Sequence, residues 1–107
     1  MTIIDTLLGI EQSINTWVFS TSATTKEEVA QMAKVFALRD RFAEETNEVV
    51  LHRIQLAGLD IAKQAADLDD LSKKIEGTEK KMSAALGMID LVSKGIDVVA
   101  SIVSLFA

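Results

Sequence analysis

The sequence contains no cysteine, no proline and no tyrosine, and its five glycines stand singly. Without cysteine the chain has no disulfide framework and no thiolate for catalysis or metal binding. Without proline it lacks the strongest helix breaker, which favours long uninterrupted helices. Isolated glycines leave no phosphate-binding loop and no dinucleotide fingerprint. These absences favour a helical protein and remove several classes of enzyme.

Basic residues are also scarce, because 11 Lys and Arg face 16 Asp and Glu, for a net charge of -5. A nucleic-acid binder needs a basic face to neutralise phosphates, so we expect no nucleic-acid partner. Residues 1–19 are rich in apolar side chains but contain no Lys or Arg. The positively charged region of a Sec signal peptide is therefore missing. We expect a cytoplasmic protein, or one exported without a Sec signal.

The most apolar stretch covers residues 86–107. Its charged residues are Asp90, Lys94 and Asp97. Together with Ser101 and Ser104 they recur at steps of three and four, which places them in one polar stripe along a helix. The stretch is about long enough to span a bilayer, but each central charge would cost roughly 2.5–3.5 kcal/mol there. The pattern predicts a buried or amphipathic helix rather than a transmembrane one.

Capping signals predict two helix starts. Thr2 and Asp5 resemble a capping pair at the start of a helix over residues 2–19. The hydroxyl-rich residues 20–25 then predict a loop, because such side chains compete for backbone hydrogen bonds. Thr25 and Glu28 form a capping box, which predicts that the next helix begins at residue 26.

Residues 26–76 contain no strong breaker and carry two apolar rows. The first row is Val29, Ala33, Phe36, Ala43, Val50, Ile54, Ala57, Ile61, Ala65, Leu68 and Ile75. The second is Val35, Leu38, Phe42, Val49, Leu56 and Leu59. Steps of three, four and seven are typical of coiled-coil-like packing. One continuous helix here would be about 75 Å long. It therefore either forms a rod or bends within residues 46–58, at Thr46-Asn47 or at Gly58.

Gly77 and Thr78 predict the end of this helix and the start of a last one over residues 79–105. The fold class is all-α, with one domain of three to four helices over residues 1–107. We expect a long central helix and apolar terminal helices. They would form either an antiparallel helical bundle or a helical rod.

One group of side chains resembles a metal or acid–base site: Glu44, Glu45, Glu48 and His52, with Asp67, Asp69 and Asp70 as further ligands across a dimer. Glu48 and His52 are four residues apart, whereas the di-iron bundle motif needs a spacing of three. An i,i+4 pair of exposed helix residues explains them without a metal. We therefore predict a protein that is not an enzyme and has no metal and no cofactor.

The apolar content of the terminal helices exceeds what we expect one copy to bury, which predicts a homo-oligomer or docking onto another helical protein. The expected interface residues are Trp17, Phe36, Phe42, Ile89, Val92, Ile96, Val99, Ile102, Val103 and Phe106. In style, though in no specific motif, the chain resembles subunits and chaperones of bacterial secretion machines and filaments. The alternative is a membrane-active, pore-forming type of protein whose C-terminal helix inserts into a bilayer, with its polar stripe lining the lumen.

Overall fold

The computed structural model describes residues 2–106 and contains no strand within them. The helices are α1 (Ile3–Phe19), α2 (Lys26–Leu51), α3 (Arg53–Leu56), α4 (Ala62–Glu76) and α5 (Ala85–Val103), and a 3₁₀ turn η1 (Met82–Ala84) precedes α5. The predicted all-α class is confirmed.

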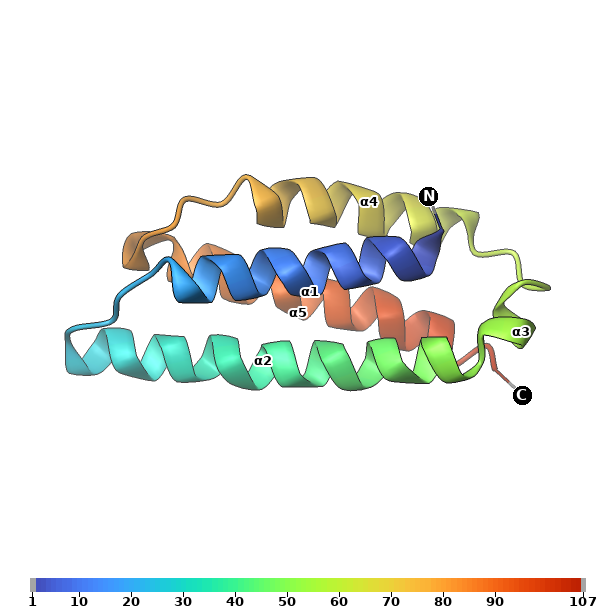
Figure 1. Cartoon of the computed structure of the whole chain (residues 1–107), viewed down its shortest axis with the longest axis horizontal. Helices are drawn as coiled ribbons and strands as arrows, with labels where there is room; N and C mark the ends of the chain where they lie inside the picture. The colour runs from blue at the N-terminus through green and yellow to red at the C-terminus, as the bar shows by residue number, and fades with distance from the viewer. Residues whose placement is uncertain (1, 107) are drawn as a thin grey trace.

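The four long helices form two helical hairpins, α1 with α2 and α4 with α5 (Figure 1). Figure 1 shows both hairpin loops at one end of the molecule, and the two chain ends at the other. α1 packs on α2 and α4, and α5 packs on α4 and, most extensively, on α2. The neighbours from different hairpins, α1 with α4 and α2 with α5, therefore run parallel. The connection through α3 joins α2 to α4, which lie diagonally opposite each other in the bundle.

Both predicted capping signals form. The Thr2 hydroxyl accepts a hydrogen bond from the Asp5 backbone N–H, and the Asp5 carboxylate accepts one from the Thr2 N–H. Thr25 and Glu28 repeat this reciprocal pair at the start of α2, with distances of 3.1 Å. Each box satisfies backbone donors that the first turn of a helix leaves free. Both helices thus begin where the sequence predicted.

The predicted long helix over residues 26–76 is not found, because α2 ends at Leu51 and α4 begins at Ala62. The molecule is 47 Å long, which excludes the 75 Å rod. His52 leaves helical geometry with φ -104° and ψ 25°. The break contains Gly58, one of the two predicted bend sites, whereas Thr46-Asn47 stays inside α2. Burial of Leu56 draws the crossover inward and supports this break.

The last helix also begins later than predicted. Gly77 caps the end of α4 as expected, but Thr78 does not start a new helix. Its hydroxyl instead donates to the Lys74 carbonyl at 2.8 Å, within the turn that has just ended. The chain then turns inward to bury Met82, and regular α-helix resumes only at Ala85.

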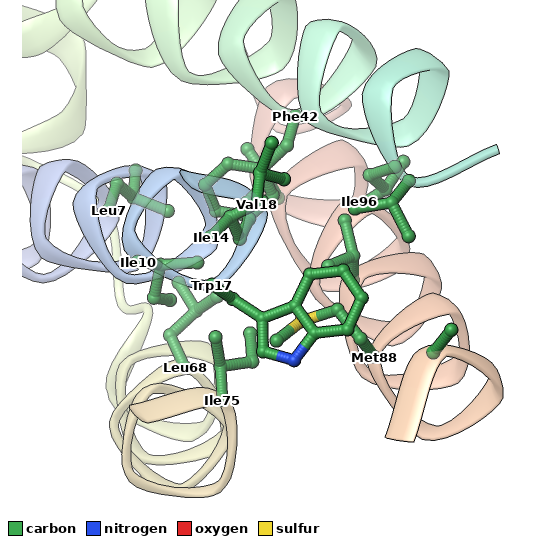
Figure 2. Close-up of a cluster of buried hydrophobic side chains, with 14 of the residues drawn as sticks. Leu7, Ile10, Ile14, Trp17, Val18, Phe42, Leu68, Ile75, Met88 and Ile96 are labelled. Atoms are coloured by element: carbon green, nitrogen blue, oxygen red, sulfur yellow. The ribbon is translucent and has the colours of Figure 1, made fainter. Parts of the chain in front are cut away.

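The core lies between the two hairpins and includes side chains from every long helix (Figure 2). Trp17 is 1% exposed, and its indole points toward Met88 of α5. α2 and α5 approach closely where a Cβ on Gly95 would lie 3.2 Å from the Phe42 ring. The apolar terminal helices are therefore covered mainly by α2 and α4, which both of them pack against.

Candidate interaction surface

Most of the predicted interface residues lie inside this chain. Six of them, from three helices, are buried in its core: Trp17, Phe42, Val92, Ile96, Val99 and Ile102. Ile89, Val103 and Phe106 are half-buried, and Phe36 is exposed. The buried six hold the helices of this chain together, and a partner could contact them only if the helices separated. The apolar surface that led us to expect a partner for the terminal helices is thus largely covered by the chain itself.

The acidic residues considered as metal ligands do not converge. Within residues 2–106, no group of three or more His, Cys, Asp or Glu side chains is arranged to hold a metal ion. His52 Nδ1 lies 3.9 Å from the Glu48 carboxylate and 2.9 Å from the Glu48 carbonyl oxygen. The three aspartates of α4 each pair with a lysine four residues away, at 3.0–3.3 Å: Lys63–Asp67, Lys73–Asp69 and Lys74–Asp70.

The polar stripe of the last helix faces solvent. Its five members are exposed: Asp90, Lys94, Asp97, Ser101 and Ser104. Lys94 pairs with Asp90 at 3.0 Å, and both serine hydroxyls donate to carbonyls of their own helix. Within residues 2–106, none of the helices combines the length and the apolar character needed to cross a membrane.

The two apolar rows of α2 differ in burial. The second row supplies the core, because Val35, Phe42 and Val49 are fully buried. The first row lies about 100° further round the helix, and its members Ala43 and Val50 are half-buried there. Its members Val29 and Phe36 are 55% and 38% exposed. α2 therefore buries one apolar row and exposes the first half of the other, at Val29, Ala33 and Phe36.

The exposed row is widest in the first half of α2. Six exposed apolar residues form it, and we call them the outer seam: Phe19 from α1 and Val29, Ala30, Ala33, Phe36 and Ala37 from α2. Phe19 is 83% exposed and borders the same depression, of about 270 Å³, as Arg39 and Asp40. Sequence reasoning missed Phe19, Ala30 and Ala37. The steps of three and four that separate the two alanines from Ala33 were the available signal.

Arg39 orders the Phe36 ring of the outer seam. Its guanidinium carbon lies 4.7 Å above the centre of the Phe36 ring, and its Nη1 donates to Asn15 of α1 at 3.2 Å. Its other terminal nitrogen lies 3.5 Å from the Asp40 carboxylate. These contacts fix one face of the Phe36 ring, which lowers the entropy that a partner would have to remove on binding.

A half-buried carboxyl group lies beside this surface. Glu11 of α1 lines the same depression. Burial raises the pKa of Glu11 above its ordinary value, and the neighbouring Thr46 hydroxyl lowers it in part. Thr46 is 1% exposed, and among residues 2–106 its Oγ1 has no hydrogen-bond partner of ordinary geometry. The Thr46 hydroxyl therefore offsets only part of the cost of burying the Glu11 carboxylate.

Two other depressions are polar. The larger, about 590 Å³, lies between α1 and α4, and hydroxyl and charged side chains line much of it. The other, about 360 Å³, lies between α4 and α5 and contains the paired residues Asp70, Lys74 and Lys94. A ligand site is usually an apolar cavity with a few converging polar groups. Neither depression has that character.

A second group of exposed apolar residues lies at the crossover end. Leu51, Ile54 and Leu105 are 72%, 86% and 46% exposed. Beside them the His52 and Phe106 rings stack with centres 4.7 Å apart, which ties the C-terminal residues to the end of α2. This group is smaller than the outer seam and has no regular spacing along one helix.

Comparisons of the chain with protein-family models, curated proteins and solved structures found no match.

Proposed function

We propose that this chain is a non-enzymatic interaction protein that self-associates, or docks onto another helical protein, through the outer seam. The observation that carries the proposal is the outer seam itself. It repeats apolar residues at coiled-coil spacing on a helix whose core-facing row is already complete. A solvent-facing helix surface normally carries charged or polar residues. An exposed seam at this spacing is typical of a helix that packs against another helix.

The charge distribution supports the same choice of surface. On α4 and α5 most of the exposed charges form i,i+4 pairs, as expected for a solvated surface. Along the outer seam the exposed charges Lys26 and Asp40 lie at its two ends and Lys34 lies at its edge, so its centre is apolar. Because charged residues are depleted at the centre of protein interfaces, this part of the surface fits a partner best.

The test is the molar mass by light-scattering chromatography over a wide concentration range. We expect the mean mass of the wild-type protein to rise with concentration, and Val29→Glu to hold it at the monomer value. Leu86→Glu is the matched control, because Leu86 is 67% exposed on the second hairpin, outside the seam. It should leave self-association unchanged. A wild-type protein that stays monomeric at all concentrations and captures no helical partner would contradict the proposal.

A further inference from the structure

The outer seam is complementary to itself about Ala33. Residues at equal distances on either side of Ala33 differ in size or in charge. Three residues away, Ala30 mirrors Phe36. Four residues away, Val29 mirrors Ala37. Two antiparallel copies of this helix would therefore place large side chains against small ones.

We propose that the outer seam binds a second copy of this chain, with α2 crossing its counterpart antiparallel at Ala33 on a twofold axis. The proposal deepens the proposed function and rests on it. A twofold contact uses the same surface patch on both copies, so a surface that complements itself is the chemical requirement. The exposed alanines at the crossing point let the two helix backbones approach closely, because they carry the smallest side chains available for helix packing.

Charges favour the antiparallel direction. Lys26 and Asp40 lie seven residues before and after Ala33, and both are exposed. In the antiparallel register the Lys26 of each copy faces Asp40 of the other, which gives two ion pairs. A parallel register would instead bring like charges together. Asp40 already pairs with Arg39 at 3.5 Å, but its side chain is 69% exposed, so its carboxylate can also accept from the Lys26 of a second copy.

The area predicts a weak dimer. The seam follows about 15 residues of α2, or about 22 Å, and spans two helices, or about 20 Å. Each copy would then bury about 450 Å², or about 900 Å² in total. This lies in the range of transient complexes rather than obligate ones. We therefore expect association at micromolar concentrations, with monomer and dimer both populated.

The position of the axis is tested by a single cysteine in the full chain, which has none of its own. On a twofold axis residue 33 meets its own copy, so Ala33→Cys should form a disulfide-linked dimer in high yield with a mild added oxidant. Ala66→Cys is the matched control, because Ala66 is exposed on α4, away from the seam. It should stay monomeric under the same conditions. Equal cross-linking of both variants would overturn the inference.

Charge reversal tests the direction. Lys26→Asp should weaken the dimer about fivefold or more. At both symmetry-related contacts the new carboxylate would face the Asp40 carboxylate of the other copy, and the two would repel. Adding Asp40→Lys should restore most of the affinity. Circular dichroism would show that both variants keep the helical fold. If Val29→Glu abolishes the dimer but Ala33→Cys does not cross-link and the double variant does not recover, the self-complementary geometry is wrong while the proposed function stands. A wild-type protein that stays monomeric would overturn the twofold dimer, and it would contradict the proposed function as well if it captured no helical partner.

Discussion

The indole Nε1–H of Trp17 donates a 2.8 Å hydrogen bond to the backbone carbonyl of Glu79, 62 residues further along the chain. This bond fixes the end of α1 to the segment between α4 and η1. The ring itself lies in the core, directed toward Met88 (Figure 2). One side chain therefore joins the two hairpins at their loop end. The Glu79 carbonyl also accepts from the Lys81 backbone N–H at 3.0 Å, so two donors hold it in the segment where the last helix begins later than predicted.

Trp17→Phe tests this connection. Phenylalanine keeps most of the apolar contact but cannot donate, so the Glu79 carbonyl keeps only its 3.0 Å hydrogen bond from the Lys81 backbone N–H. We expect a loss of about 1–3 kcal/mol in the free energy of unfolding, from the lost hydrogen bond together with the space that the smaller ring leaves in the core. Urea unfolding followed by circular dichroism measures it, since the variant has no tryptophan fluorescence. Leu86→Ala, at an exposed position, is the control and should change stability little. Unchanged stability of Trp17→Phe would show that water replaces the bond at no cost.

Local chemistry made the helix starts predictable. The boxes at Thr2 and Thr25 depend on side chains and backbone within one turn, so the sequence contains the whole interaction. The break after Leu51 depends instead on distant packing, because only the assembled core buries Leu56 and leaves Leu51 exposed. The composition of α5 was also misleading. Its broad apolar surface indicated a partner, but within the fold α2 and α4 cover it.

The sequence predicted part of the outer seam but not which apolar row of α2 would be exposed. Periodicity identified both apolar rows of α2, including Val29, Ala33 and Phe36. It could not decide which row meets the core, because either row suits an amphipathic helix. That choice follows from Phe42, whose ring packs against Gly95 of α5. A glycine in a helix interior is unfavourable by propensity alone, and its role as the space for an aromatic ring becomes visible only in the assembled fold.

A pair of glycine substitutions checks this packing. A Cβ at Gly95 would lie 3.2 Å from the buried Phe42 ring, whereas a Cβ at Gly9 would have nothing within 4 Å. Alanine in a helix interior is favoured over glycine by about 0.5–1 kcal/mol. Gly9→Ala should therefore stabilise the protein by about that amount. Gly95→Ala should destabilise it by about 1–2 kcal/mol, because overpacking outweighs the propensity gain. Thermal melts compare the two, and a stabilised Gly95→Ala would show that the core can adjust.

Glu11 gives a pH-dependent prediction. Because burial raises the pKa of Glu11 in the folded protein, the folded state holds its proton more tightly than the unfolded chain does. Below the unfolded pKa both states are protonated, and Glu11 has no net effect. As the pH rises through the folded pKa, the ionised group becomes a penalty on folding. The penalty is complete above the folded pKa.

Glu11→Gln should therefore raise the melting temperature at pH 7, and the gain should disappear below about pH 4, near the ordinary Glu pKa. The measurement is a series of melts of both proteins between pH 3 and pH 8. Glu44→Gln, at an exposed position on α2, is the control for removing one negative charge from an acidic protein. If both substitutions stabilise equally at pH 7, net charge rather than burial explains the effect.

Thr46 combines near-complete burial with a hydroxyl that lacks an ordinary hydrogen bond within the described residues. Valine has nearly the same shape and a similar helix propensity. An unsatisfied buried hydroxyl costs about 1–3 kcal/mol, so Thr46→Val should raise the free energy of unfolding by about 1 kcal/mol. At pH 7 the gain should be larger in the Glu11→Gln background, where no carboxylate remains for the hydroxyl to stabilise. Urea unfolding of the four proteins in this double-mutant cycle gives the coupling. Destabilisation by Thr46→Val in both backgrounds would mean that the hydroxyl is satisfied, through a contact that the valine removes.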